Sequence, residues 1–351
     1  MGVEIDTYRG DGEDLADLIQ RSWNHTYGGK SWFPLWDADY LRWRLLERTA
    51  AHRELVVVAH QAGKLVGCVI SEPTALRVRG ESLPGALTSY LSVDPHCTVR
   101  HLGLRLLDEL RDRHRARGLR LALGVTNAKP GSEAKRFWEA LGRRGPEVHC
   151  RFGGLTTWAV VGADGAVARA GLSTPERLAM RLGGWLPWGW TGRSGAAVYH
   201  DQSAPTAGDD LRLLRAAAER ADIAMDWDSE TAVRHLYHPR VFSFRHPLAP
   251  ALLAGYLMPW RGRCDLQVAL IDVIANGADD DALIELFIGA GRALRREGAQ
   301  MIVVMDMGAA PRAALRRAGF LAVASQVDYF ALLAAPDLGL EPGMSVAVPF
   351  T

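Results

Sequence analysis

The sequence predicts a mixed α/β fold that occurs twice, in two lobes of the same architecture. In the first half, β-rich runs form an antiparallel meander that is followed by a strand–helix–strand–helix–strand order. That order implies a mixed sheet covered by helices, with one crossover between parallel neighbours. A shorter version recurs near the C-terminus, and a stretch rich in Gly, Pro, Ser and Asp separates the two. We therefore expect an N-terminal domain at 1–165, a connector at 166–210 and a C-terminal domain at 211–351.

The first lobe begins with helices and a hairpin. Apolar residues at helical spacing predict helices at 13–27 and 38–47. Two β-rich runs at 54–61 and 64–71 flank the dipeptide Ala62-Gly63. A tight glycine-containing turn between two such runs is typical of a β-hairpin.

The rest of the first lobe supplies the crossover. A break at Pro84-Gly85 precedes a third strand, expected at 85–93. The segments that follow are an amphipathic helix at 103–117 that stops at Gly118, a strand at 119–126, a helix at 132–142 between Ser132 as N-cap and Gly142 as stop, and a strand at 155–161.

The second half repeats this order. The expected elements are a strand at 266–274, a helix at 279–296, a strand at 301–307, a helix at 310–318 and a strand at 326–333. The segment WDADYLRWR at 36–44 is echoed by WDSETAVRH at 227–235. These parallels indicate a diverged internal duplication.

Composition narrows the function. The chain has 351 residues, of which 48% are hydrophobic and 23% charged, with a formal net charge of +1. That balance indicates a globular protein and gives no electrostatic reason to expect a nucleic-acid partner. No run of eighteen apolar residues and no secretory signal are present, so we expect a cytoplasmic protein without stable membrane insertion. The spacing of the four cysteines and eleven histidines matches no metal motif, so no metal is expected.

The strongest local signal joins a strand to a helix at 91–107. Its loop contains Arg100 and Gly103. A helix N-terminus has backbone N–H groups without partners and the positive end of the helix dipole, and glycine lets a ligand approach the backbone closely. The segment therefore predicts an anion site that suits a pyrophosphate.

This segment resembles motif A of the GNAT superfamily of acyl-CoA N-acyltransferases. In that pattern a strand ending in Val-x-Pro is followed by Arg/Gln-x-x-Gly-x-Gly/Ala and a long helix. Arg100 and Gly103 match it, whereas Arg105 stands where Gly or Ala is usual. Downstream, Asn127 and the FWEALG segment at 137–142 match the next family elements. The resemblance covers about residues 3–160, and 266–333 has no such loop.

The resemblance implies a role for each matched position, with acetyl-CoA or another acyl-CoA as co-substrate. The backbone at Leu91, Ser92 and Val93 would align the pantetheine, and an N–H of Val93 or Ser92 would polarise the thioester carbonyl. Asn127 and Trp138 would lie along the CoA arm. The loop residues that would hold the pyrophosphate are Arg100, His101, Leu102, Gly103, Leu104 and Arg105.

The sequence identifies the acid and the base of the reaction less clearly than the CoA-binding residues. Trp138 replaces the tyrosine that the family offers as an acid for the leaving thiolate, and an indole N–H is no usable acid. Candidates for the general base are Glu72, Tyr90 and His149. The alternative interpretation places Tyr90 in the core and Glu72 on the surface at a strand end.

A CoA-binding lobe followed by a degenerate one also resembles the tandem architecture of N-myristoyltransferases, N-acyl amino acid synthases and Fem-type ligases. In these the acceptor lies between the lobes. Trp185, Trp188 and Trp190 in the connector would then cover an acyl chain or acceptor, anchor the protein at a membrane interface, or fill the interface between lobes.

The function predicted is transfer of an acetyl or longer acyl group from acyl-CoA to an amine of a small-molecule or peptide acceptor, by direct attack in a ternary complex. One alternative is a CoA-binding module that has lost catalysis. Another is an amide ligase that uses aminoacyl-tRNA, against which the near-neutral charge argues. The sequence identifies neither the acceptor nor the oligomeric state.

Overall fold

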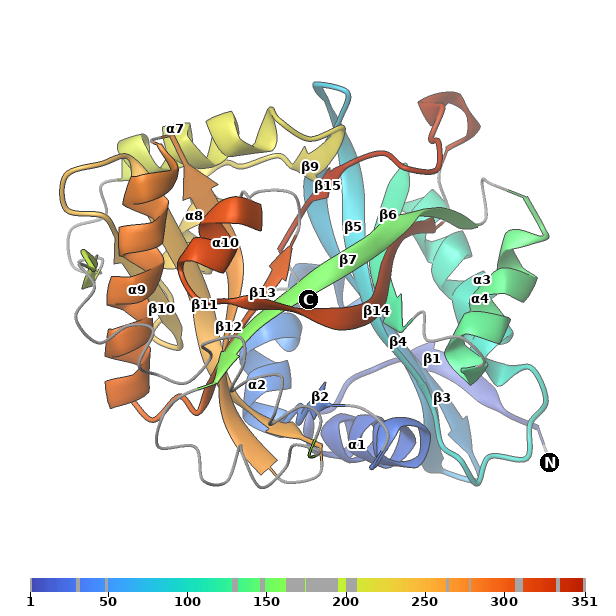
Figure 1. Ribbon diagram of the computed structural model, residues 1–351. Coiled ribbons are helices and arrows are strands. Elements are labelled where there is room, and N and C mark those ends of the chain that lie inside the picture. Colours follow the sequence, from blue (N-terminus) through green and yellow to red (C-terminus); the bar gives the residue numbers. More distant parts are fainter. Residues whose placement is uncertain are drawn as a thin grey trace. The chain divides into compact units, whose positions relative to one another are not determined.

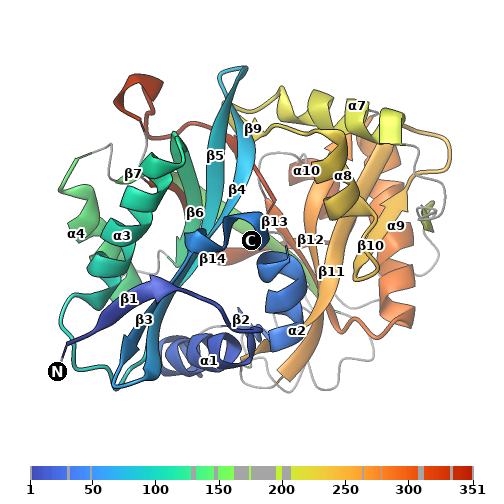
Figure 2. The ribbon, with the colours of Figure 1, turned by 180° about the vertical axis from the view of Figure 1, so that it is seen from behind.

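The computed structural model describes residues 2–29, 32–47, 50–127, 132–145, 149–161, 174, 195–199, 207–262, 265–277, 279–306, 312–332 and 335–349. These residues form two compact units. The first unit comprises Met1–Gly153, Val327–Gly343 and Thr351, and the second comprises Gly154–Gln326 and Met344–Phe350. Figures 1 and 2 show the elements of each unit from two sides.

The sheet of the first unit follows the order β1-β3-β4-β5-β6-β14. Its strands are β1 (Glu4–Thr7), β3 (Val56–Gln61), β4 (Lys64–Val78), β5 (Glu81–Val93), β6 (Leu121–Asn127) and the second half of β14 (Leu321–Leu332). All neighbouring pairs are antiparallel except β5 and β6, which are parallel. The predicted mixed sheet with one parallel crossover is confirmed.

Helices cover both faces of this sheet. They are α1 (Glu13–Tyr27), α2 (Ala38–Leu41) with the π-helix Arg42–Leu46, α3 (Leu102–Ala116) and α4 (Glu133–Gly142). This part of the chain also contains the short strand β2 (Phe33–Pro34) and a 3₁₀-helix at Ala50–Leu55. Apolar residues of α3 and α4 share one core with Val57 and Ala59. The two helices lie side by side next to the sheet (Figure 1). Because side chains alternate along a strand, Val58 and its partner Cys68 face the other side. On that side α1 packs, with Trp23 bonded to Ser92.

Local sequence signals set the helix ends. The helix predicted at 13–27 is confirmed residue for residue. Ser132 caps α4, since its hydroxyl accepts a hydrogen bond from the Lys135 N–H at 3.1 Å. Gly118 follows α3 with a φ of 68°, a left-handed conformation that glycine adopts without strain.

The break expected at Pro84-Gly85 is wrong, because both residues lie inside β5. The chain turns instead at Arg79-Gly80, where both φ angles are positive, and β4 extends to Val78. Proline is tolerated at 84 because pairing with β6 begins only at Gly85. The Pro84 carbonyl still accepts a hydrogen bond from the Arg120 N–H.

The second unit has the same plan. Its sheet order is β7-β13-β12-β11-β10-β8. The strands are β7 (His149–Val161), β8 (Val198–Tyr199), β10 (Val241–Arg245), β11 (Ala251–Arg261), β12 (Asp265–Asn276) and β13 (Met301–Asp306), and the helices are α7 (Ala207–Ala218), α8 (Ser229–Leu236), α9 (Asp280–Arg296) and α10 (Arg312–Arg317). β12 and β13 are the parallel pair. The second unit also contains a short parallel pair, β9 (Ile223–Met225) with β15 (Val346–Ala347). A 3₁₀-helix at Pro336–Leu338 belongs to the first unit. α7, α8, β10 and β11 are absent from the sequence-based expectation.

The two units exchange strands. The last residues of β14 pair with β6 in the first unit, although they follow α10 in sequence. Residues 156–161 of β7 pair with β13 in the second unit, although they follow α4. Each sheet is therefore completed by a segment from the other half of the chain. Most of 166–210, including Trp185, Trp188 and Trp190, lies outside the described residues, so the expected domain boundaries and the tryptophan roles stay predictions.

Candidate functional site

The two parallel strands of the first unit part at their carboxyl ends. Pairing of β5 with β6 runs from Gly85↔Leu121 to Thr88↔Gly124, and both strands continue beyond it. The register of β5 against β4 shifts at the same place, between Ser89↔Ile70 and Ser92↔Cys68. Two residues, Tyr90 and Leu91, thus oppose one on β4, and Tyr90 has a φ of 58°. This β-bulge bends β5 just after its last pair with β6.

The register after the bulge decides which backbone groups face the parted edge. The Asp94 N–H donates to the Val66 carbonyl at 2.9 Å, so Asp94 forms a hydrogen-bonded pair with β4. Such pairs alternate along an antiparallel ladder, so Ser92 also directs its N–H toward β4, at Cys68. The N–H of Val93 points the other way, toward the edge that β6 leaves.

The N-terminus of α3 lies one loop further along the chain. Its N-cap, His101, has a φ of 60° and makes no side-chain cap hydrogen bond. The N–H groups of Leu104 and Arg105 donate to the His101 carbonyl. The first turn has no acidic residue, and Arg100, His101 and Arg105 are exposed there. This helix end therefore presents a positive dipole, basic side chains and early N–H groups together.

Gly103 has no packing reason to be glycine. A Cβ at this position would meet only the Phe137 ring, at 3.5 and 3.7 Å, which is ordinary van der Waals contact. Glycine in a helix costs roughly 0.5–1 kcal/mol relative to alanine. Packing within the protein therefore does not explain the glycine. A ligand that approaches the backbone at this position would explain it.

Asp94 anchors the start of this loop, and the sequence-based search missed it. Its carboxylate is 2% exposed, accepts from the His96 N–H at 2.9 Å, and lies 3.2 Å from Arg21 and 3.5 Å from Lys64. Burial alone would raise the pKa of Asp94, but the His96 N–H and the two cations outweigh it and hold the pKa below its usual value. The Asp-Pro pair directly after a strand was the available signal.

Two base candidates are brought together in the interior. Tyr90 and Glu72 are 4% and 6% exposed, and the Tyr90 hydroxyl lies within electrostatic reach of Glu72, Arg44 and Tyr40. Burial, followed by the Tyr40 hydroxyl, raises the pKa of Tyr90 well above 10. Trp23 stacks on the Tyr90 ring at 6.4 Å between centroids. Tyr90 is therefore a protonated core residue at neutral pH, and Glu72 is buried, not a surface charge.

The other predicted residues lie elsewhere in the first unit. Trp138 is 9% exposed and packs in the core with residues of α3. Its ring stacks on His149 at 5.6 Å between centroids and lies tilted against Phe330 at 4.5 Å. His149 lines a surface hollow with Cys150 and Arg151, and burial lowers its pKa. Asn127 ends β6, but its side chain lies outside the described residues. The roles proposed for all three stay predictions.

The second unit repeats the parting of strands with different chemistry. Pairing of β12 with β13 ends at Ile271↔Val304, and the next residue, Asp272, is an extra residue in β12 opposite β11. A Cβ on Gly255 would overlap the Leu270 carbonyl, so the bulge requires glycine on β11. The following helix, α9, is capped by Asp279, whose carboxylate accepts from the Ala282 N–H at 2.9 Å, and its first turn is acidic.

Two absences complete the description. No helix within the described ranges is long and apolar enough to cross a membrane. Among the side chains whose positions are described, no group of three or more His, Cys, Asp or Glu is arranged to hold a metal ion.

The parted parallel strands, the bulge and the basic helix end without a side-chain cap all lie in the part of the chain whose sequence resembles the GNAT superfamily. Comparisons with known proteins agree. Residues 7–133 match the family described as the acetyltransferase (GNAT) domain. This match covers less than half of the chain and shows a GNAT domain in its N-terminal part. A search of curated proteins finds no match to the sequence.

Solved structures extend the likeness over the whole chain. The N-myristoyltransferase of Saccharomyces cerevisiae, solved with bound myristoyl-CoA, has a TM-score of 0.70 at 13% identity, with 99% of this chain and 84% of that chain covered. A GCN5-related N-acetyltransferase from Kribbella flavida has a TM-score of 0.54 at 15% identity, with 95% and 72% covered. At these identities the likeness shows the fold, and it confirms the two-lobe mixed α/β prediction.

Proposed function

We propose that this protein transfers an acyl group from acyl-CoA to an amine of a small-molecule or peptide acceptor. One observation carries the proposal: the β5–β6 pairing ends at Thr88, and the strand edge beyond it leads into the uncapped, basic N-terminus of α3. An extended chain with a pyrophosphate fits this combination, because the edge offers backbone hydrogen bonds and the helix end offers N–H groups to phosphate.

Each part of the loop has a task in this proposal. The N–H groups of Leu102 and Gly103, with Arg100 and Arg105, bind the pyrophosphate oxygens. The Leu91 backbone and the Val93 carbonyl pair with the pantetheine amides, which leaves the Val93 N–H for the thioester. Gly103 keeps the approach to the backbone open. His101 supplies the left-handed residue that turns the loop into the helix.

Catalysis in this proposal rests on position and on one oxyanion donor. The acceptor nitrogen attacks the thioester carbonyl, a C–N bond forms, the C–S bond breaks, and the nitrogen loses a proton as the thiolate leaves. The Val93 N–H points toward the parted edge, whereas that of Ser92 points to β4, so Val93 is the better donor to the developing oxyanion. Tyr90 stays protonated and acts through its place in the bulge.

Isothermal titration calorimetry tests the CoA assignment. We expect micromolar or tighter binding of acetyl-CoA, a longer acyl-CoA or free CoA, and its loss in an Arg100→Ala/Gly103→Asp double variant. Arg115→Ala is the matched control, because it removes a charge from the other end of the same helix, where Arg115 is exposed beside Asp112. A chain that ignores every CoA species contradicts the proposal.

A second candidate is a CoA-binding module without catalysis. Trp138 favours it, because its indole is packed against His149 and Phe330 and supplies no acid for the thiolate. A thiol-release assay with a broad panel of amines separates the two. CoA binding without acyl-dependent thiol release from any amine would favour the module.

A further inference from the structure

A charged side chain joins helix α1 to the end of β5. Arg21 of α1 donates from Nε at 3.3 Å and from Nη2 at 3.2 Å to one carboxylate oxygen of Asp94, Oδ2. Lys64, at the start of β4, lies 3.5 Å from the same oxygen. Asp94 directly follows Val93, the last residue of β5. One oxygen of Asp94 therefore collects the contacts from α1 and β4.

The other oxygen of Asp94 belongs to the loop. Oδ1 accepts a hydrogen bond from the His96 N–H at 2.9 Å, and the Asp94 carbonyl accepts one from the Cys97 N–H, also at 2.9 Å. These bonds form a turn at 94–97 that begins the path to Arg100 and the N-terminus of α3. Because the two oxygens contact different partners, the carboxylate links the position of Arg21 to that of the turn.

Burial makes this link strong. A buried carboxylate is costly without a partner, so the position of Asp94 follows the cations beside it. Lys64 is the more exposed and the more distant of the two cations. Arg21 offers two N–H groups in the fixed geometry of a guanidinium. Arg21 is therefore the partner that fixes the carboxylate and, through it, the turn.

Helix α1 is held in place by other contacts. Its residues Leu15, Leu18 and Ile19 are buried, and Trp23 donates to the Ser92 hydroxyl. The Arg21 side chain, in contrast, is partly exposed. Its removal should thus change the turn at 94–97 and leave the packing of the helix as it is.

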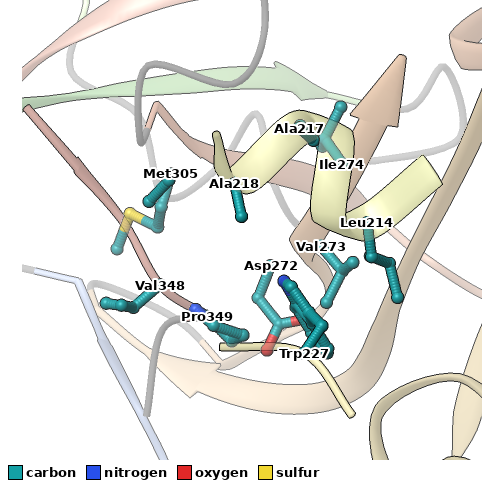
Figure 3. Close-up of a pocket in the computed structure, with 11 residues that line it drawn as sticks. Leu214, Ala217, Ala218, Trp227, Asp272, Val273, Ile274, Met305, Val348 and Pro349 are labelled. Carbon is teal, nitrogen blue, oxygen red and sulfur yellow. The ribbon is translucent and has the colours of Figure 1, made fainter. Parts of the chain in front are cut away.

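The corresponding helix of the second unit uses its arginine differently. The same number of residues separates the end of α1 from Trp36 and the end of α7 from Trp227, so Arg212 stands in the place of Arg21. Arg212 pairs with Asp209 of its own helix. Side chains of α7 and β12 line a mostly apolar pocket, which Figure 3 shows. The ion pair from Arg21 to the strand end thus occurs in the unit that has the candidate CoA loop.

We propose that Arg21 is a positioning residue for CoA, which acts through Asp94 to hold the turn at 94–97 and the loop after it in the conformation that binds the pyrophosphate. The proposal rests on the acyl-CoA function proposed above. It adds to the site a helix that packs on the face of the sheet opposite to α3. Arg21 itself does not contact the ligand, because its charge is used by the Asp94 carboxylate.

Hydrogen exchange with mass spectrometry tests the link in the intact chain without ligand. We expect Arg21→Ala to speed exchange in peptides that cover 94–104 by about fivefold or more, while the peptides of α1 stay unchanged. Arg21→Lys keeps a cation and should restore most of the protection. Arg42→Ala is the matched control, since the Arg42 side chain is also 41% exposed and ion-paired, but with Asp39. Unchanged exchange of the loop in Arg21→Ala, or equally faster exchange of α1, would overturn the proposal.

A double-variant cycle tests whether Arg21 acts through Asp94. By titration calorimetry, Arg21→Ala should weaken CoA binding about fivefold, and by less than about twofold when Asp94→Asn is already present. Equal losses with and without Asp94→Asn would show that Arg21 contacts the phosphates itself, and no loss would show that the turn has no part in binding; either result overturns the proposal. A chain that binds no CoA species contradicts the proposed function and this role with it, whereas the exchange experiment without ligand still shows whether Arg21 orders the loop.

Discussion

The imidazole Nε2 of His114 lies 2.8 Å from the Ser71 hydroxyl oxygen in the middle of the first unit. Ser71 in turn lies 2.9 Å from the Thr88 hydroxyl, and all three residues are buried. The network ties α3 to β4 and to Thr88, the last residue of β5 that pairs with β6. It therefore holds the helix against the strands at the point where the candidate CoA site begins.

His114 should make stability fall in mild acid. Burial lowers its pKa from 6.5 to about 4, so the unfolded chain takes up a proton that the folded chain refuses. Its contribution is complete above pH 6.5 and is lost as the pH falls from 6.5 to about 4, by about 3 kcal/mol in total. Denaturant unfolding at several pH values, compared with His114→Gln, measures this. Equal slopes for both proteins between pH 6.5 and 4 would contradict it.

The oxyanion assignment predicts a difference between adjacent residues. Val93→Pro removes an N–H that faces away from β4 and should lower kcat by about 10²-fold or more. Ser92→Ala keeps its N–H and loses only the hydroxyl that accepts from Trp23 Nε1, so kcat should change little. Thiol-release kinetics with a responsive amine give both values. If Ser92→Ala proved the more damaging of the two, Val93 would not be the donor.

Arg105, which replaces the small residue usual in the family, should help to bind a CoA phosphate. It is exposed in the first turn of α3. We expect Arg105→Ala to weaken CoA binding about tenfold at low salt, as one charged hydrogen bond would. The loss should shrink as salt rises. Titration calorimetry at two ionic strengths measures it, and tighter binding by the alanine variant would show instead that the side chain crowds the site.

The cysteines should differ sharply in reactivity. Burial raises the pKa of Cys68 to about 12, and its thiol donates to the Tyr90 carbonyl inside the sheet. Because the thiolate is the nucleophile, iodoacetamide at pH 8 should leave Cys68 unmodified while half-buried Cys97 reacts. Peptide mass spectrometry follows each site, with a sample in denaturant as the control. Fast labelling of Cys68 in the folded protein would show that this part of the sheet opens readily.

Two glycines of the second unit should respond oppositely to alanine. Gly255→Ala forces a Cβ onto the Leu270 carbonyl at the β11–β12 bulge and should cost about 2–3 kcal/mol. Gly208 in α7 has open space around it, so Gly208→Ala should be neutral or stabilise by up to about 1 kcal/mol. Thermal unfolding of both variants gives the comparison. A harmless Gly255→Ala would mean that the bulge relaxes without cost.

Much of the fold was accessible from local patterns because helices and their ends are encoded locally. The 13–27 helix, the Ser132 cap and the Gly118 stop depend on residues within one or two turns of each other. The same local patterns gave a wrong strand break at Pro84 and Gly85. A proline interrupts a strand only where a neighbouring strand would otherwise accept a hydrogen bond from an N–H at that position. That neighbour, β6, lies almost forty residues further along the chain.

The residues of the candidate site likewise fall into those that the sequence predicts and those that only the packing reveals. Arg100, Gly103 and the strand before them could be proposed from the sequence because the candidate anion-binding loop is continuous in the chain. Asp94, the contact of Trp23 with Ser92 and the burial of Glu72 were not predicted, because they result from packing of α1 and α2 on the sheet. Asp272 looked like any other residue of a strand until the β12 register showed it in a bulge.

The sequence by itself determined the repeated strand and helix order, the basic loop before α3 and the GNAT resemblance, since each is carried by residues close together in the chain. Only the tertiary structure decided that β7 and β14 complete each other's sheets, that the Val93 N–H and not that of Ser92 faces the parted strands, and that the second unit has a carboxylate at its bulge. The physical reason is that strand register and burial arise from contacts between residues far apart in sequence, which no local pattern encodes.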